Sequence, residues 1–387
     1  MNPSTSSSPD GDKPDTGSPD TGNPDSAQTL LELNGIDSAW LSGELNRSGV
    51  EGVVTGIDAK LVGTGQVGEN VRCELSWATL PAAGDGLPER PDSVVIKLAS
   101  SNATSRAAAE ATRTYIREVG FYRDLADSVS IRVPRVHHVS EDRAANSFIL
   151  VMEDIAPAAA GNQLAGSTLA QAELAVAAAA DLHGSTWNRP ELAELDWLDK
   201  PDEQSNAERV ELFGMLHTGF VERYREMLGP EELQFGQWLA ANFEEWLDSR
   251  SEPQCLVHGD FRLDNMLFGT DDPAPPLATV DWQTPSLGRA LSDVAYFLSG
   301  SFDRATRQSN ETALLDLYRN RLTEYGIELS PEETMREYRL AAPAGYVMAA
   351  IASQLVGQTD RGDQMFMVMA SGSAAQAIDI DTVGMLS

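Results

Sequence analysis

The segment from residue 257 to residue 283 constrains the fold more than any other part of the chain. It contains His258-Gly259-Asp260, then Asn265, and sixteen residues later Asp281 at the end of a second apolar run. Residues 269–276 are typical of a turn, so the apolar runs on either side of them are predicted to pair as a β-hairpin. The hairpin would bring Asn265 and Asp281 to one end, with Asp260 just before it.

The residue types in this segment favour phosphoryl transfer. Magnesium prefers hard oxygen ligands and keeps several waters, so Asn265 and Asp281 suffice beside the phosphate oxygens of a nucleotide. Asp260 is then free to accept the proton of an attacking hydroxyl. Each residue taken singly is more often a loop cap or a turn residue. Their order and spacing together favour a magnesium-assisted site.

In this segment the sequence resembles the aminoglycoside phosphotransferase-like family, which includes choline kinase-like and ecdysteroid kinase-like enzymes. The residues that match the family pattern are His258, Gly259, Asp260, Asn265, Asp281, Gly288 and Asp293. The resemblance covers roughly residues 53–381. It implies Asp260 as the catalytic base and Asn265 and Asp281 as the magnesium ligands. Gln283 departs from the pattern, because many members carry a carboxylate there.

A glycine-rich loop, Gly63-Thr-Gly65-Gln-Val-Gly68, precedes this segment by almost two hundred residues. In a dinucleotide fingerprint such a loop opens a helix. Here the residues after Gly68 alternate like a strand, which favours a strand–loop–strand cover over a triphosphate. A plain hairpin turn is the alternative interpretation.

Lys97 lies in the apolar run of residues 94–98, where an amine is costly unless it meets an anion. We predict that it contacts the α- and β-phosphates and is held by Glu118, from a helix over residues 105–127. Glu110 is the rival partner, and a surface ion pair is the alternative. The family resemblance also implies that backbone groups from Glu153 to Ile155, between the lobes, contact the purine.

The order of predicted elements indicates an α+β, protein-kinase-like fold with two lobes. Residues 1–27 repeat Pro-Asp every five residues and contain almost nothing apolar, so they are predicted to be a disordered tail. Residues 28–155 are predicted to form a small nucleotide-binding lobe with an antiparallel sheet. Residues 156–387 are predicted to form a large, mainly helical catalytic and substrate-binding lobe.

The amino-acid composition limits the classes of partner that the protein is expected to bind. The net charge is −31, and only four lysines face 59 acidic residues, so nucleic acid and anionic membrane surfaces are disfavoured. Salt adaptation is one interpretation of the acidity, and attraction of a cationic substrate is another. Residues 340–358 carry no charge and match a membrane span in length, yet Pro343 and the many alanines favour a buried helix. With two cysteines and no visible secretory signal, a cytoplasmic location is expected.

These patterns together predict a phosphotransferase that uses magnesium and ATP, with GTP as the alternative, to phosphorylate a hydroxyl of a small molecule. A non-catalytic nucleotide-binding sensor or scaffold is the alternative function, which the intact set of Lys97, Asp260, Asn265 and Asp281 disfavours. A nucleotide-dependent oxidoreductase is disfavoured by the strand pattern after Gly68. Aminoglycosides, other amine alcohols, macrolides and lipid-like alcohols all stay open as acceptors, and the oligomeric state is undetermined.

Overall fold

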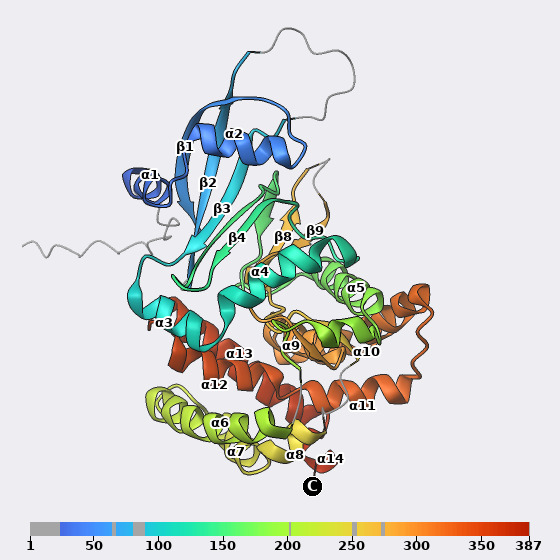
Figure 1. The fold of residues 1–387 in the computed structure, drawn as a ribbon. Helices are drawn as coiled ribbons and strands as arrows, with labels where there is room; N and C mark the ends of the chain where they lie inside the picture. Colours follow the sequence, from blue (N-terminus) through green and yellow to red (C-terminus); the bar gives the residue numbers. More distant parts are fainter. Residues whose placement is uncertain are drawn as a thin grey trace, which may run out of the picture.

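The computed structural model describes residues 24–63, 67–79, 90–200, 203–249, 254–271 and 275–386. The chain forms a small lobe built on an antiparallel sheet and a larger lobe made mostly of helices (Figure 1). The predicted α+β architecture with two lobes is confirmed. The predicted boundary between residues 155 and 156 stays a prediction, and the five-stranded sheet ends two residues before it.

The small lobe contains a five-stranded sheet of order β1-β2-β3-β5-β4, with all neighbouring strands antiparallel. The strands are β1 (Val54–Val62), β2 (Gly68–Trp77), β3 (Ser93–Ala99), β4 (Val136–Asp142) and β5 (Ser147–Glu153). Side chains alternate between the two faces of a strand. On β3, Ile96 and Leu98 join the core beneath the first two helices, whereas Lys97 faces the opposite side.

Helices α1 (Pro24–Leu33) and α2 (Ser38–Arg47) cover the outer face of the sheet and contact β1 (Figure 1). Ala27 and Leu31 of α1 are fully buried in the core on that face. Residues 24–27 therefore belong to the fold, and their assignment to the disordered tail is wrong. Residues 1–23 lie outside the described ones, and their disorder stays a prediction.

Two helices replace the single helix predicted over residues 105–127. They are α3 (Ala103–Ala111) and α4 (Thr114–Asp124), and a short 3₁₀ turn follows α4. Arg113 breaks the run because its φ of 56° is left-handed, a conformation that cannot continue a right-handed helix. The break turns α4 onto the inner face of the sheet, where it contacts β4 and β5.

Helix α4 is fixed by close contact with two tryptophans of the large lobe. The indole of Trp197 lies directly on the backbone at Gly120, where any Cβ would collide with it. Its Nε1 donates to Asp124 Oδ2 at 2.8 Å. Phe121 stacks on Trp282, with 3.7 Å between ring centroids and 2° between planes. These contacts fix the position of the helix that carries Glu118.

The large lobe consists of helices and two small antiparallel sheets (Figure 1). Its helices are α5 (Leu169–Ser185), α6 (Glu203–Tyr224), α7 (Pro230–Ala241), α8 (Phe243–Asp248), α9 (Leu291–Ser301), α10 (Arg304–Leu322), α11 (Pro331–Ala341), α12 (Ala344–Leu355), α13 (Asp360–Asp379) and α14 (Thr382–Met385). Its strands are β6 (Ala158–Ala160), β7 (Cys255–Val257), β8 (Met266–Gly269), β9 (Leu277–Thr279) and β10 (Ser286–Gly288). Strand β8 pairs with β9, so the predicted hairpin is confirmed.

The uncharged segment 340–358 spans the end of α11 and all of α12. The chain breaks at Pro343, which lacks the N–H needed to continue a helix. One face of α12, including Tyr346, Ala349 and Ala350, is fully buried, as predicted. Among the described residues no helix is both long and apolar enough to cross a membrane.

Because Trp197 lies so close to Gly120 of α4, one added methyl group at this position should have a large effect on the free energy of unfolding. Gly120→Ala should lower the free energy of unfolding by about 1–3 kcal/mol, because the indole or the helix must shift. Gly214→Ala is the matched control, since Gly214 lies in α6 with open space around its Cα. It should raise stability by about 0.5–1 kcal/mol. Urea unfolding of both variants checks the pair, and equal stability of the two would contradict the packing.

Candidate active site

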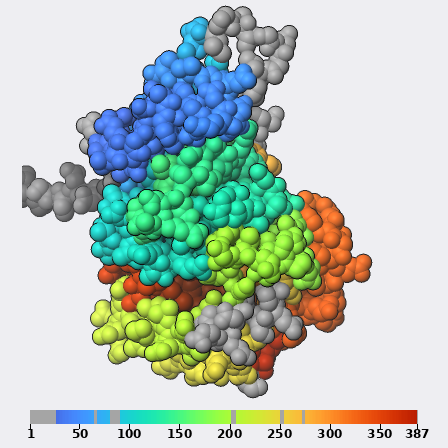
Figure 2. Space-filling view, in the orientation of Figure 1, coloured from blue at the N-terminus to red at the C-terminus, as the bar shows by residue number. Residues whose placement is uncertain are grey.

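A cavity of about 1450 Å³ lies between the lobes and is lined by both. In Figure 2 the red surface of α12 and α13 is visible between the teal small lobe and the yellow-green α6. The predicted residues Lys97, Glu118, Asp260, Asn265 and Asp281 all line this cavity. Tertiary structure therefore brings together residues that lie as much as 184 positions apart.

Lys97 is held between two carboxylates. Its Nζ lies 2.6 Å from Glu118 Oε1 and 2.8 Å from Asp281 Oδ1. Lys97 is 5% exposed and Glu118 is fully buried. The predicted Lys97–Glu118 pair is thus confirmed, and the rival Glu110 is exposed on α3.

The protonation of Lys97 follows from these neighbours. Burial alone would lower the pKa of its ammonium group. The negative charges of Asp281 and Glu118 outweigh burial and raise the pKa above its ordinary value. Lys97 therefore stays positively charged.

Asp281 and Gln283 flank the buried Trp282. Asp281 adopts a left-handed φ of 65°, a conformation that costs energy in a residue with a side chain. Gln283 Nε2 donates to Glu118 Oε2 at 3.2 Å. A carboxylate at position 283 would face Glu118 with like charge, so the amide suits this site. The departure from the family pattern has a local electrostatic reason.

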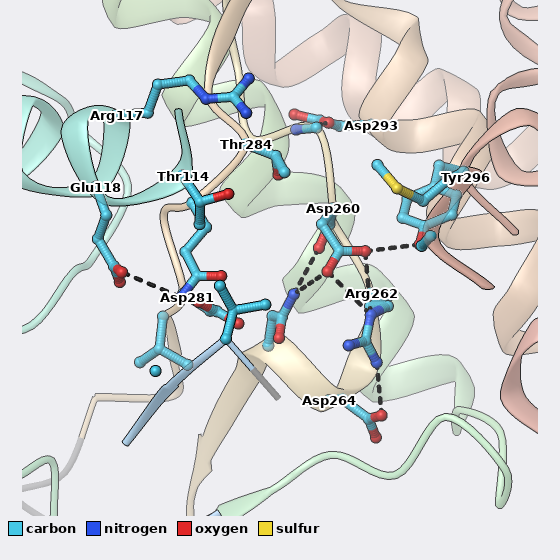
Figure 3. A pocket seen from close by; sticks show the side chains of 18 of the residues that line it. Thr114, Arg117, Glu118, Asp260, Arg262, Asp264, Asp281, Thr284, Asp293 and Tyr296 are labelled. Carbon is cyan, nitrogen blue, oxygen red and sulfur yellow. Dashed lines mark hydrogen bonds and ion pairs between the residues drawn. The ribbon is translucent and has the colours of Figure 1, made fainter. Parts of the chain in front are cut away.

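Asp260 lies at the centre of a second polar cluster (Figure 3). Its Oδ1 accepts from Tyr296 Oη at 2.7 Å and from Arg262 Nε at 3.0 Å. Its Oδ2 accepts from Asn265 Nδ2 at 2.8 Å. Burial would raise the pKa of the Asp260 carboxyl, but the charge of Arg262 and the Tyr296 hydrogen bond lower it. Asp260 is therefore ionised, the form in which a carboxylate can accept a proton.

Asp293 holds the loop that carries Asp260. This carboxylate is 1% exposed and accepts from the backbone N–H groups of His258 and Gly259 at 2.7 and 3.0 Å. His183 Nε2 lies 3.2 Å from Asp293 Oδ2, and His183 Nδ1 lies 2.9 Å from Tyr318 Oη. These contacts give His183 a polar role in orienting Asp293.

His258 stabilises the loop from within. Its Nδ1 accepts from the N–H of Asp260 at 3.3 Å. The other ring nitrogen, Nε2, must then carry the proton, and it donates to the carbonyl of Val280 at 3.1 Å. The imidazole thus connects the loop to the strand end just before Asp281.

Two residues of the cluster, Arg262 and Tyr296, were not identified from the sequence. Arg262 follows Asp260 by two positions, and its Nη1 also binds Asp264 at 2.5 Å. Its position between Asp260 and Asn265 in the motif could have identified it as a residue of the site. Tyr296 follows Asp293 by three positions on α9, a spacing that puts both on one side of the helix. Nothing in the sequence indicates that this side faces Asp260.

Part of the glycine loop lines the small-lobe side of the cavity. Gly63 and Gly68 line it, and a Cβ at Gly68 would lie 3.4 Å from Lys97 Cε. Strands β1 and β2 flank the loop, which confirms the strand–loop–strand arrangement. Gly65 lies outside the described residues. The roles of these glycines in binding phosphate stay predictions.

The segment between the lobes lines the cavity, and some of its polar groups are engaged within the protein. Glu153 and Ile155 line the cavity, but the N–H of Glu153 donates to the carbonyl of Arg135 at 2.8 Å. The Glu153 carboxylate binds Arg132 Nη2 at 2.5 Å. The N–H and the carboxylate of Glu153 are therefore engaged within the protein. Contact of a purine with the rest of this segment stays a prediction.

The oxygens of Asn265 and Asp281 suit a magnesium ion. Val280 N–H donates to the carbonyl of Asn265 at 3.0 Å. Asp281, which follows Val280, therefore lies on a chain segment next to Asn265. The amide nitrogen of Asn265 is engaged by Asp260, so its amide oxygen is the atom left for a ligand. The described residues contain no group of three or more His, Cys, Asp or Glu side chains able to hold a metal ion. Two oxygens completed by phosphate and water are typical of magnesium rather than of a structural metal site.

Comparison with known proteins agrees with this geometry. A model of the phosphotransferase enzyme family matches residues 91–338, more than half of the chain. A putative aminoglycoside phosphotransferase from Ralstonia eutropha is 17% identical, with a TM-score of 0.51 over 89% of this chain and 98% of that one. A GDP complex of a mutant aminoglycoside 2'-phosphotransferase-IIIa is 12% identical, with a TM-score of 0.51 over 91% of this chain and 100% of that one. At these identities the solved structures show the fold, which is the predicted protein-kinase-like one.

Curated relatives match over a shorter stretch. Acyl-CoA dehydrogenase family member 11 from Homo sapiens is 37% identical over 68 residues, which is 18% of this chain and 8% of that protein. Acyl-CoA dehydrogenase family member 10 from Mus musculus is 39% identical over 85 residues, which is 20% of this chain and 7% of that protein. The chain thus matches less than a tenth of the length of these relatives.

The buried Lys97 predicts a strong dependence of stability on its charge. Lys97→Met should lower the free energy of unfolding by about 3–5 kcal/mol, because Glu118 is left buried without its cation. Lys97→Met combined with Glu118→Leu should recover much of the loss. Lys60, whose ion pairs lie at the surface, is the matched control, and Lys60→Met should unfold close to the wild type. Equal destabilisation by Lys97→Met and Lys60→Met in urea would show that the pair is not structural.

Proposed function

The chain belongs to the phosphotransferase enzyme family, and from that membership we propose that it transfers the γ-phosphoryl group of ATP to a hydroxyl of a small molecule. GTP is the alternative donor. The observation that carries the proposal is the convergence of Lys97, Asp260, Asn265 and Asp281 on one cavity between the lobes. Similar solved structures named as GDP complexes of aminoglycoside phosphotransferases support nucleotide binding.

The small lobe supplies the nucleotide side of the proposed site. Lys97 Nζ would meet the α- and β-phosphates, with Glu118 keeping the ammonium in position. Gly63 and Gly68, which have no side chains to block an approach, would let the loop lie close to the triphosphate. The Lys97–Asp281 contact spans the two lobes, so phosphates would bind where the lobes are already held together.

Asn265 and Asp281 would hold magnesium through one amide and one carboxylate oxygen. When bound, the ion would offset the negative charge of the phosphates during transfer. Asp281 Oδ1 is engaged by Lys97, so Asp281 Oδ2 is the oxygen available to the ion. The Asp281 side chain is 36% exposed, which leaves it accessible from the cavity.

Asp260 would receive the proton of the acceptor. The acceptor oxygen forms a bond to the γ-phosphorus, and the bond from that phosphorus to the β–γ bridging oxygen breaks. The hydroxyl proton passes to the Asp260 carboxylate as the transition state forms. Tyr296 and Arg262 donate to the same carboxylate and would keep it aimed at the hydroxyl. A sensor or scaffold without catalysis has no need of an ionised Asp260 facing the cavity.

The proposal includes a cytoplasmic location, where nucleoside triphosphates are available. Cys73 and Cys255 are free and buried, which is consistent with a reducing compartment. The acidity of the chain supports a small-molecule acceptor rather than nucleic acid as the partner.

Replacement of the proposed base tests the chemistry. Asp260→Asn should lower kcat by about 10²–10⁴-fold, the usual contribution of a general base. The fold and the affinity for nucleotide should persist, because Asn keeps the size of the side chain. Steady-state kinetics with an identified acceptor, combined with nucleotide titration, measure both effects.

Two comparisons make this test specific. Asp281→Asn should weaken binding of magnesium-nucleotide, whereas Asp316→Asn, at a half-exposed surface ion pair, should change neither constant. If folded Asp260→Asn keeps most of its kcat, Asp260 is not the base. If Asp260→Asn raises only the KM for nucleotide, it belongs to the metal site instead.

Nucleotide and magnesium should stabilise the protein together. At about 100 times its dissociation constant, magnesium-ATP or magnesium-GTP should add about 2.7 kcal/mol to the free energy of unfolding. Removal of magnesium with EDTA should abolish most of the resulting rise in melting temperature. The absence of any shift with either nucleotide in thermal melts would contradict the proposal.

A further inference from the structure

Helix α12 carries a second apolar face that other parts of the protein cover only partly. Residues spaced by three and four positions along it line the cavity and are half-buried or exposed: Ala344, Val347, Met348, Ile351, Ala352 and Leu355. The opposite face of the same helix is buried in the lobe. The uncharged segment noted in the sequence is therefore apolar on two sides, and one of them faces the cavity.

Three further elements, α6, α8 and α13, extend this apolar surface around the cavity. From α8, Phe243, Trp246 and Leu247 line it, and from α13, Met365, Phe366 and Met369 do so. Leu212 of α6 and Leu355 of α12 also line it, although they are 42% and 38% exposed. Phe243, Trp246, Met365, Phe366 and Met369 are themselves buried, so the open part of the surface consists of the α12 face, Leu212 and Leu247. Apolar side chains left open in a concave site are typical of a surface that binds an apolar ligand.

The apolar surface reaches the proposed base. Tyr296 Oη donates to Asp260 Oδ1 at 2.7 Å and lies 3.7 Å from Met369 Sδ. A molecule lying against α12 and α13 would thus have one end beside Asp260.

The charges that line the cavity do not favour a cationic ligand. Eight Lys or Arg side chains and eight Asp or Glu side chains occur among its described lining residues, so the lining carries no net charge. Each of those carboxylates already accepts a hydrogen bond or ion pair. Asp199, for example, binds Arg113 and Arg117, and Asp264 binds Arg262 and Arg361. Asp281 Oδ2, which Lys97 leaves open, is the oxygen proposed above for magnesium, so an ammonium group that entered the cavity would lose water and compete with the metal ion for it.

We propose that the acceptor is an uncharged, apolar alcohol whose hydrocarbon part lies along the α12 face and whose hydroxyl reaches Asp260. This inference rests on the proposed phosphotransferase function and specifies the substrate class of the same site. The cation-attracting interpretation of the acidity is not supported by the lining of the cavity.

A matched pair of alcohols tests the class of acceptor. The full chain is assayed for ADP release from magnesium-ATP, or GDP release from magnesium-GTP, with 1-octanol and 8-amino-1-octanol. We expect kcat/KM for 1-octanol to exceed that for the amine at least tenfold. It should fall about fourfold for each methylene removed, the change that about 0.8 kcal/mol produces. Equal or faster turnover of the amine, or turnover of kanamycin instead of 1-octanol, overturns the inference and leaves the proposed function standing.

Variants of two isoleucines locate the effect. Ile351→Asp places a carboxylate on the cavity face of α12 and should raise the KM for 1-octanol at least tenfold, with the KM for nucleotide unchanged. Ile378→Asp is the matched control, because Ile378 is exposed on α13 and does not line the cavity. Identical effects of the two variants would show that the alcohol does not lie on α12.

A binding measurement separates failure of the inference from failure of the proposed function. The neutral probe N-phenyl-1-naphthylamine should bind the wild type and Ile378→Asp, bind Ile351→Asp at least tenfold more weakly, and be displaced by 1-octanol. If this holds while no alcohol is phosphorylated, the apolar site stands and the phosphotransferase proposal fails. If the probe does not bind the wild type, the apolar site is wrong, whatever the activity.

Discussion

The buried ammonium group of Lys97 is the interaction on which the rest of the site depends. A charge on an apolar strand is tolerated only if opposite charges meet it, and here they come from α4 and from the segment after β9. This one requirement fixes the distance between the sheet, the helix on its inner face and the large lobe. The stacking of Phe121 on Trp282 reinforces the same three-way junction, because each ring lies within three residues of one of the two carboxylates.

The loop around Asp260 follows a different principle, in which hydrogen bonds from other elements hold its backbone and side chains. Asp293 of α9 binds two N–H groups of the loop, and His258 ties the loop to the carbonyl of Val280. Buried hydrogen bonds of this kind make a loop rigid. A rigid loop can keep the Asp260 carboxylate aimed into the cavity, since its orientation would otherwise depend on a flexible turn.

The net negative charge of the chain is not concentrated in the cavity. The chain has a net charge of −31, yet the described lining of the cavity has equal numbers of acidic and basic side chains. Carboxylates inside the cavity are held by arginines such as Arg262 and Arg117. Outside it, acidity bears on solubility and on repulsion of other anions. Within it, apolar contact and hydrogen bonds decide what binds.

The sequence by itself determined the elements that local patterns encode. Alternation after Gly68 predicted β2, turn residues predicted the β8–β9 hairpin, and the spacing of Asp260, Asn265 and Asp281 predicted their convergence, because the pairing of neighbouring strands follows from nearby residues. It did not predict the break at Arg113, the Tyr296–Asp260 contact or the second apolar face of α12. Only the tertiary structure decided these features. Which face of a helix meets a cavity depends on the packing of distant elements, and a left-handed residue is favoured only when the helices on both sides of it are already fixed.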